Sequence, residues 1–239
     1  MVQGKTALVT GANKGLGYEM ARQLAERGYT VWLGSRDRGR GEAAAAKLAS
    51  AGEVRVLELD VGDAEAIRRA AQAVAGETDH LDVLINNAGI APPDAGKAST
   101  ADPQVVRAVF ETNVFGALTV TQAFLPLVRR SSAGRIVMIS SGLGSLSRLA
   151  DPTDSVGTWE QMAYSASKAA LNAITIAFAN ELRDTPIKVN AINPGVVATD
   201  INNHRGMPPE QGVRRAIEMA TMEDGPTGGF FNDSGVEPW

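Results

Sequence analysis

Short apolar runs alternate with longer segments of helical periodicity along nearly the whole of this 239-residue chain. The short runs fit buried strands, whereas the longer segments place apolar residues at three- and four-residue steps, as one face of a helix does. Strands that alternate with helices in this way form βαβ units and a parallel sheet covered by helices on both faces. Strands are expected at 6–9, 30–33, 54–59, 81–85, 135–139, 187–192 and, at an edge, 228–231, and helices at 16–27, 40–51, 64–75, 104–130, 163–184 and 210–221.

No repeat, low-complexity tract or linker interrupts this alternation, and α/β domains of this length are common. We therefore predict a single α/β domain over residues 1–239, with a doubly wound (Rossmann) parallel sheet of about seven strands and helices on both faces. In such a sheet, ligands bind in the crevice outside the carboxyl ends of the strands. The residues that follow each strand are therefore the first candidates for a functional site.

Composition excludes several classes of function. A net charge of -4 and a pI near 5.3 provide no overall positive field for binding nucleic acid or an anionic membrane. The chain has no cysteine for a disulfide, a thiolate metal site or a nucleophile, and His80 and His204 lack metal-ligand spacing, so no metal is expected. No apolar run is long enough to span a bilayer, and residues 1–5 lead into a strand without the features of an export signal. We expect a cytoplasmic protein.

A glycine-rich loop follows the first strand, with the sequence TGANKGLG at 10–17. Gly11, Gly15 and Gly17 would allow a tight turn, a close approach of backbone to phosphate, and close packing of the next helix on the strand. The free N–H groups and the dipole at the start of that helix can hold a pyrophosphate. The loop therefore predicts a dinucleotide site, although its spacing is GxxxGxG rather than GxGxxG. The alternative is a glycine-rich turn that binds no ligand.

The residues after the second strand bear on the choice of dinucleotide. An acidic residue there would bind the ribose 2′-hydroxyl of NAD, whereas an arginine accommodates the 2′-phosphate of NADP. Arg36 follows Ser35 directly, and Lys14 offers a second cation for the phosphate. These residues predict a preference for NADP(H), while Asp37 leaves NAD(H) open. A solvated charge cluster over 36–40 is the alternative.

Tyr164 and Lys168 lie four residues apart at the start of the expected helix 163–184. Positions four apart are neighbours on a helix, so the phenol and the ammonium should lie side by side. A cation beside a phenol favours the phenolate and lowers the tyrosine pKa, which suits a general acid or base near neutral pH. For this pair alone, an ordinary surface contact is the alternative.

Taken together, the motifs of this chain resemble those of the short-chain dehydrogenase/reductase family over nearly its whole length. The loop at 10–17 matches the family's TGxxxGxG, and 59–61 matches its acidic residue against the adenine. The remaining matches are NNAG at 86–89, YSASK at 164–168 for the family's YxxxK, and NPG at 193–195 with Thr199 for its PG motif. Within the family, Asn13, Lys14 and Arg36 resemble the NADPH-dependent carbonyl reductases.

The resemblance implies a catalytic tetrad of Asn113, Ser141, Tyr164 and Lys168. Tyr164 would donate the proton when a carbonyl is reduced, and Lys168 would lower its pKa and bond to the nicotinamide ribose. Ser141 would bind the substrate carbonyl and stabilise its oxygen as negative charge develops. Asn113 would hold a water beside the lysine. Two alternatives stay open, namely a purely structural Asn113 and Ser140 in place of Ser141.

The resemblance also implies a set of cofactor-binding residues. The cofactor supplies the hydride, while the protein fixes orientation and the proton. The implied residues are Gly11, Asn13, Lys14, Gly15, Leu16, Gly17, Arg36, Asp60, Val61, Asn87, Ala88, Gly89, Tyr164, Lys168, Pro194, Gly195, Val197 and Thr199.

The segment 143–162 departs from the shorter members of the family. It resembles, in shortened form, an insertion that carbonyl reductases carry beside the active site, and it is expected to wall one side of the substrate pocket. The candidates for its apolar lining are Leu146, Leu149, Trp159 and Met162. The alternative is a surface loop that touches nothing catalytic.

The segment 196–209 often forms a substrate lid in the family and is short here, which suggests an open, permissive site. Family members often associate through two long helices, here 104–130 and 163–184, and insertions can block that contact. A monomer and a homo-oligomer therefore both stay open.

The resemblance implies an NADPH-dependent carbonyl reductase that acts on small or medium aldehydes and ketones, reversibly toward secondary alcohols, and this is the function we predict. One alternative is a dedicated dehydrogenase of a steroid, terpenoid or sugar. Another is a non-catalytic NADP(H)-binding regulator that has kept the fold, although the complete tetrad argues against it.

Overall fold

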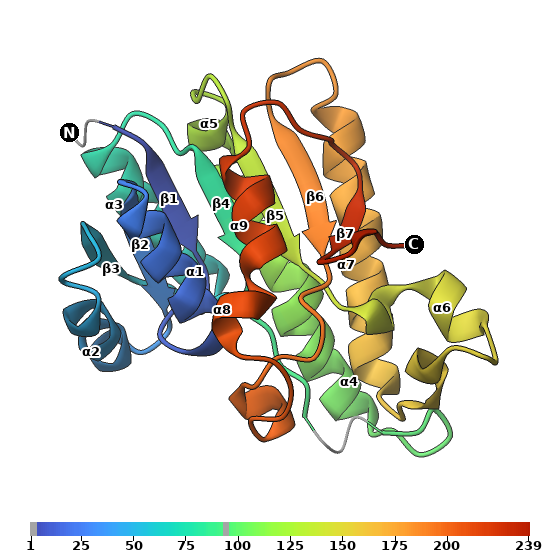
Figure 1. The fold of residues 1–239 in the computed structure, drawn as a ribbon. Coiled ribbons are helices and arrows are strands. Elements are labelled where there is room, and N and C mark those ends of the chain that lie inside the picture. Colours follow the sequence, from blue (N-terminus) through green and yellow to red (C-terminus); the bar gives the residue numbers. More distant parts are fainter. Residues whose placement is uncertain (1–3, 93–95) are drawn as a thin grey trace.

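The strands form one sheet in the order β3-β2-β1-β4-β5-β6-β7-β8 (Figure 1). The structure is a computed structural model that describes residues 4–92 and 96–239, so residues 1–3 of the stretch read for an export signal lie outside it. Neighbouring strands from β3 through to β7 pair in parallel, and β8 pairs antiparallel with β7. The prediction of a doubly wound parallel α/β fold is confirmed. The strands are β1 (Thr6–Val9), β2 (Thr30–Ser35), β3 (Val54–Glu58), β4 (Val83–Asn86), β5 (Arg135–Ile139), β6 (Lys188–Ile192), β7 (Phe230–Asn232) and β8 (Gly235–Val236).

The winding of the sheet places a topological switch point between β1 and β4, and we call the space outside the carboxyl ends of these strands the crevice. The chain passes from β1 outward to β2 and β3, then returns to the other side of β1 with β4 and continues to β5 and β6. The loops after β1 and β4 therefore leave neighbouring strands and turn to opposite faces. Such a switch point is where open α/β sheets bind their ligands.

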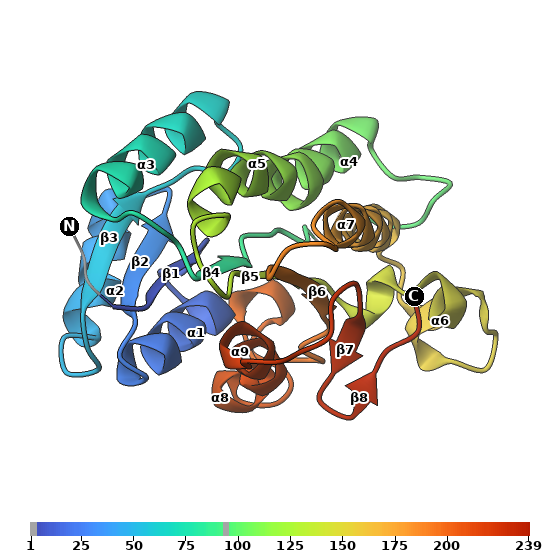
Figure 2. The ribbon, with the colours of Figure 1, turned by 90° about the horizontal axis from the view of Figure 1, so that it is seen from above.

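Helices cover both faces of the sheet (Figure 2), with α1 and α9 on one face and α3, α5 and α7 on the other. In β1, Ala7 and Val9 pack against one helical layer and Leu8 against the other, because successive strand residues point to opposite faces. Both faces are buried, which explains the continuous apolar runs. No helix within 4–92 and 96–239 is both long and apolar enough to cross a lipid bilayer. The helices are α1 (Gly15–Glu26), α2 (Arg38–Lys47), α3 (Ala64–Glu77), α4 (Pro103–Phe110), α5 (Ala117–Val128), α6 (Leu146–Ala150), α7 (Met162–Glu181), α8 (Pro209–Gly212) and α9 (Arg214–Thr221).

The helix expected over 104–130 is not continuous. It divides into α4 and α5, which are joined by a π-helical turn over Glu111–Gly116. Gly116 lies so close to the chain after β3 that a Cβ on it would come within 2.7 Å of the Val61 carbonyl oxygen. Single π-helical turns frequently mark functional sites, and this one contains Asn113.

Two expectations for the end of the chain were wrong in detail. The strand expected at the sheet edge, β7, is covered by β8, so the sheet has eight strands rather than about seven. A tight turn joins them, in which Ser234 N donates to Asn232 Oδ1 at 2.8 Å. The helix expected over 210–221 divides at Val213 into α8 and α9. Two strand residues and one helix break are too short to register as hydrophobic periodicity.

Candidate active site

The glycine loop (residues 10–17) presents an uncapped helix start at the carboxyl edge of the sheet. α1 begins at Gly15, and Lys14 at the N-cap position makes no side-chain capping bond. By contrast, α2, α3 and α4 are each capped by an aspartate, namely Asp37, Asp63 and Asp102. The first N–H groups of α1 therefore lack a side-chain acceptor among the described residues. A phosphate group is the kind of acceptor that such a helix start favours.

The predicted glycines have the conformations and the spacing that this loop needs. Gly11 and Gly15 adopt φ values of 62° and 57°, in the left-handed region that glycine tolerates best. A Cβ on Gly17 would come within 2.5 Å of both the Gly11 carbonyl oxygen and Asn87 Nδ2. Leu16 packs toward Gly212, and Asn13 is half-buried.

Thr10 fastens the glycine loop to the loop after β4. Its Oγ1 accepts hydrogen bonds from the N–H groups of Asn87 and Ala88 at 2.9 and 3.0 Å. Asn87 Nδ2 donates in return to the carbonyl oxygens of Thr10 and Gly11 at 2.8 and 3.2 Å. This role of Thr10 is not among the predictions from the sequence. The threonine after the last apolar residue of β1 was the available signal.

Asn113 holds the next part of the β4 loop against α7. Its Oδ1 accepts from Ile90 N at 2.8 Å, and its Nδ2 donates to Ile90 O at 2.9 Å and to Ser167 Oγ at 3.0 Å. A Cβ on Gly89 would lie 3.3 Å from Asn113 Oδ1 and 3.6 Å from Lys168 Nζ. The structure thus brings Gly89, Asn113 and Lys168 together at the crevice.

The two serines after β5 face different surroundings. Ser140 is buried, and its hydroxyl donates to Asn172 Oδ1 at 2.6 Å, while Asn172 Nδ2 donates to Gly144 O at 3.0 Å. Ser141 is only partly buried, and its Oγ accepts from Leu143 N at 3.2 Å. Ser140 therefore has a buried structural partner, whereas Ser141 is partly accessible.

Tyr164 and Lys168 lie on one face of the first turns of α7, as predicted. Lys168 Nζ lies 5.5 Å from the centroid of the Tyr164 ring and donates to Ile139 O at 2.7 Å. The Lys168 residue is only 4% exposed, whereas Tyr164 is partly accessible. The ammonium thus links the tyrosine to the end of β5, immediately before the two serines.

Burial shifts the pKa values of both groups. It raises the pKa of Tyr164 to about 12, opposed by a side-chain hydrogen bond with Ser141. It lowers the pKa of Lys168 to about 8. The tyrosine shift is the reverse of the predicted lowering. Desolvation disfavours the charged form of either group, which is the phenolate of Tyr164 and the ammonium of Lys168.

Arg36 and Asp37, at the end of β2, differ in their hydrogen-bond partners. Arg36 is exposed, and no hydrogen bond or ion pair engages it within the described residues. Asp37 instead caps α2, since its Oδ1 accepts from Arg40 N at 2.8 Å and its Oδ2 faces the Arg40 guanidinium at 3.8 Å. The Asp37 carboxylate, which kept NAD(H) open as an alternative cofactor, is therefore engaged in capping α2.

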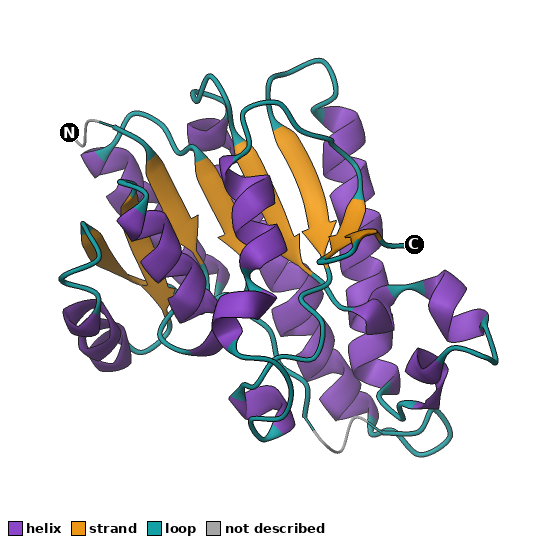
Figure 3. Cartoon of the chain, viewed as in Figure 1, coloured by secondary structure: helices purple, strands orange, loops and turns teal. Residues whose placement is uncertain are grey.

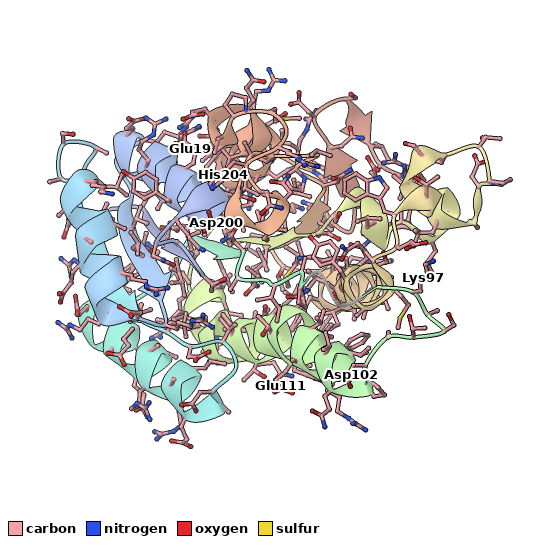
Figure 4. All side chains as sticks on the ribbon, turned by 90° about the horizontal axis from the view of Figure 1, so that it is seen from below. Glu19, Lys97, Asp102, Glu111, Asp200 and His204 are labelled. Atoms are coloured by element: carbon pink, nitrogen blue, oxygen red, sulfur yellow. The ribbon has the colours of Figure 1, made fainter. Side chains whose placement is uncertain are left out.

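Lys14 has a partner that the sequence did not suggest. Its ammonium pairs with Asp200, whose other carboxylate oxygen lies 3.0 Å from His204 Nε2. Asp200 and His204 lie close together at the carboxyl edge of the sheet (Figure 4). The glycine loop is thereby tied to the segment 196–209.

No cluster of His, Cys, Asp or Glu within the described residues is suited to hold a metal ion.

The remaining predicted cofactor residues follow β3 and β6 at the carboxyl edge of the sheet. Asp60 is exposed and accepts from Gly62 N at 2.9 Å, and Val61 packs against Gly116. Gly195 has a φ of 76°, which turns the chain after β6. The segment then returns to the glycine loop, because Thr199 Cγ2 would contact a Cβ on Gly15 at 3.4 Å. Val197 is buried nearby and bridges to Met207, and Pro194 is half-buried.

The segment 143–162 folds into short helical pieces (Figure 3), among them α6. It is joined to the loop after β4, since Met162 N donates to Gly96 O at 3.0 Å and Glu160 pairs with Lys97 at 3.3 Å. Leu146 and Trp159 are 65% and 50% exposed. Their expected contact with a substrate stays a prediction.

Comparisons with known proteins agree with this geometry. The family profile described as short chain dehydrogenase matches residues 5–208. Short-chain dehydrogenase anuI of Penicillium roqueforti is 37% identical over 222 residues, which cover 90% of this chain and 87% of that protein. Carbonyl reductase (NADPH) 1 of Mus musculus is 30% identical over 276 residues, with 98% of each chain covered. The structure of NADPH-bound carbonyl reductase from chicken fatty liver matches at a TM-score of 0.87 and 26% identity, with 100% of both chains covered.

Proposed function

The chain belongs to the short-chain dehydrogenase/reductase family of oxidoreductases, and we propose that it reduces small or medium aldehydes and ketones with NADPH, Tyr164 acting as general acid. The reverse reaction would oxidise the corresponding secondary alcohol. The observation that carries the proposal is the grouping of Tyr164 and Ser141, both partly buried and partly accessible, with a buried Lys168 where β5 and α7 meet.

The protein residues divide the work on the carbonyl oxygen between them. Bound NADPH supplies the hydride. The Ser141 hydroxyl donates a hydrogen bond to the substrate oxygen, which stabilises the negative charge that develops there. The Tyr164 phenol, kept protonated at neutral pH by a pKa of about 12, donates the proton. The Lys168 ammonium, with a pKa of about 8, stabilises the phenolate that is left.

The residues around the crevice fit NADPH. The uncapped start of α1 suits the pyrophosphate, and Gly15 and Gly17 keep the loop free of side chains. Arg36 suits the 2′-phosphate, because it is exposed and unengaged while the neighbouring Asp37 caps α2. The predicted role of Lys14 at that phosphate would require it to leave Asp200. In this proposal, the segment 143–162 forms one wall of the substrate pocket.

Replacing Arg36 with leucine is expected to weaken NADPH binding by roughly 10- to 100-fold, the worth of one charge-assisted phosphate contact. NADH binding should change little, because NADH lacks the 2′-phosphate. The dissociation constants of both cofactors are measured by fluorescence titration. Arg38→Leu is the matched control, since Arg38 is also exposed but is paired with Glu42 at 2.9 Å. An unchanged NADPH affinity in Arg36→Leu would contradict the assignment.

The proposed activity is tested by incubating the protein with NADPH or NADH and a panel of aldehydes, ketones, ketoesters, steroids, terpenoid ketones and sugars. Consumption of NADPH with several small carbonyl compounds supports a carbonyl reductase. Turnover confined to one steroid, terpenoid or sugar would identify a dedicated dehydrogenase instead. Tight NADPH binding without turnover of any compound would favour a regulator and contradict the proposal.

A further inference from the structure

A buried carboxylate outside the tetrad joins three parts of the chain that border the site. The Glu237 side chain is only 1% exposed. Its Oε1 accepts from Arg148 Nη1 at 2.6 Å and from Asn193 Nδ2 at 3.2 Å, and its Oε2 accepts from Asn232 Nδ2. Buried charges are rare and costly unless they are paired and hydrogen-bonded, so this carboxylate holds its partners in one arrangement.

The bond to Asn193 acts on the turn after β6. Because Asn193 Nδ2 donates to Glu237, its Oδ1 is directed to the other side, where it accepts from Gly195 N at 3.0 Å. Gly195 has the left-handed φ of 76° that forms this turn. Glu237 therefore selects the orientation of the Asn193 amide, and this orientation holds the Pro194–Gly195 turn that borders the cofactor crevice.

The bond to Arg148 acts on the segment 143–162. Arg148 lies in α6 and also binds Asp154, through Nε at 2.7 Å and Nη2 at 3.2 Å. The last residues of the chain support the same piece, since Ser147 N donates to Trp239 O at 2.9 Å and the Trp239 ring stacks on Phe230 at 5.3 Å. Glu237 thus fixes α6 to the β7–β8 hairpin.

Two of the three partners of Glu237, Arg148 and Asn193, meet immediately beside Ser141. A Cβ on Gly142 would lie 2.8 Å from Arg148 Nη1, 3.0 Å from Asn193 Nδ2 and 3.6 Å from Glu237 Oε1. Gly142 directly follows Ser141. A shift of either partner would therefore be transmitted to the backbone that carries the Ser141 hydroxyl.

We propose that Glu237 is a positioning residue of the active site. Through Asn193 it holds the Pro194–Gly195 turn, and through Arg148 it holds the segment 143–162. It thereby keeps both next to Ser141. This inference rests on the proposed reductase function for its substrate readout. Its effect on cofactor binding can be measured without turnover.

Glu237→Gln is the most direct test, because it keeps the size of the side chain and removes its charge. In either orientation the new amide nitrogen faces a donor, from Asn232 on one side or from Arg148 and Asn193 on the other. Arg148→Met separates the effect on the segment 143–162 from the effect on the Pro194–Gly195 turn, since it releases α6 but leaves the bond between Glu237 and Asn193. Asp233→Asn is the matched control, because Asp233 lies on the same hairpin but pairs with Arg214 at the surface.

Measurements are made well below the melting temperature of each variant. Glu237→Gln is expected to raise the NADPH dissociation constant about threefold or more and the carbonyl KM about fivefold or more, beyond the roughly twofold change of a neutral surface substitution. Arg148→Met should raise the carbonyl KM alone, and Asp233→Asn should change neither. Hydrogen exchange in 142–158 and 193–199 should be faster in Glu237→Gln than in the control.

A Glu237→Gln protein that melts earlier but keeps NADPH affinity, carbonyl KM and exchange in both segments within about twofold of wild type would show that Glu237 only stabilises the fold, and would overturn the proposal. If Glu237→Gln does not fold, an unchanged carbonyl KM in Arg148→Met overturns it. If wild type turns over no carbonyl compound, the proposed function has failed. The NADPH affinity and hydrogen exchange of Glu237→Gln then still decide the role of Glu237.

Discussion

Tyr164→Phe is expected to lower kcat/KM for carbonyl reduction by about 100- to 10,000-fold, the range for a lost general acid. The change removes the phenolic proton and leaves the ring that packs at the start of α7. Because the phenol stays protonated at neutral pH with a pKa of about 12, the loss should be similar across neutral pH. The affinity for NADPH, measured by fluorescence titration, should remain close to that of wild type.

Tyr29→Phe is the matched control for this substitution. Tyr29 also lies next to a lysine, with Lys5 Nζ 5.7 Å from its ring centroid, but the pair sits at the amino end of β1 and β2, away from the crevice. Tyr29→Phe should retain the activity of wild type. Equal activity of Tyr164→Phe and Tyr29→Phe would remove Tyr164 from the proposed mechanism.

Lys168→Met is expected to lower kcat/KM by about 100-fold or more, comparable to the loss of an acid–base group. The ammonium sits 5.5 Å from the Tyr164 ring and would no longer stabilise the phenolate formed by proton donation. In wild type, the rate of reduction should fall as pH rises through about 8, where Lys168 loses its charge. This pH step should be absent from the residual rate of Lys168→Met.

The same substitution has a distinct effect on stability. Burial lowers the pKa of Lys168 from 10.5 to about 8, so between these pH values the unfolded chain holds a proton that the folded chain has released. The free energy of unfolding of wild type therefore rises with pH across this window. Relative to Lys168→Met, the free energy of unfolding of wild type should rise by on the order of 3 kcal/mol from pH 8 to pH 10.5. Below pH 8, the cost of burying the charged Lys168 ammonium is fully present.

Denaturant unfolding of both proteins at several pH values measures this difference. Lys5→Met, which removes the ammonium beside Tyr29, is the control and should follow the wild-type curve. A constant difference between wild type and Lys168→Met from pH 8 to 10.5 would show that Lys168 is not desolvated in the folded protein.

The order of strands and helices could be predicted because each strand is buried on both faces and each main helix has an apolar face. β1 illustrates this, since Ala7, Leu8 and Val9 contribute alternately to the two cores. The interruption at Asn113 could not be predicted, because the apolar periodicity runs on through it. The close approach of Gly116 in this turn to Val61, which lies far away in the sequence, is visible only in the fold. β8 was missed because two residues carry no periodicity.

The parts of the candidate site that depend on local backbone conformation or on spacing along one helix could be predicted. Gly11 and Gly15 need the left-handed region, and Tyr164 and Lys168 share a helix face. The pairing of Lys14 with Asp200 could not be predicted, since it joins two loops through the fold. The pKa of Tyr164 was misjudged because the sequence shows the neighbouring cation but not the depth of burial, which here dominates.

Transfer of a deuterium label tests the central proposal most directly. The protein is incubated with NADPH that carries deuterium at both hydrogen positions of the nicotinamide C4 and with an aldehyde or ketone that turns over. The alcohol product is analysed by mass spectrometry and NMR. We expect one deuterium on the carbinol carbon of every product molecule, with labelled product formed by Tyr164→Phe about 100- to 10,000-fold more slowly. Alcohol that forms without the label, or no alcohol from any compound of the panel, would contradict hydride transfer at this site.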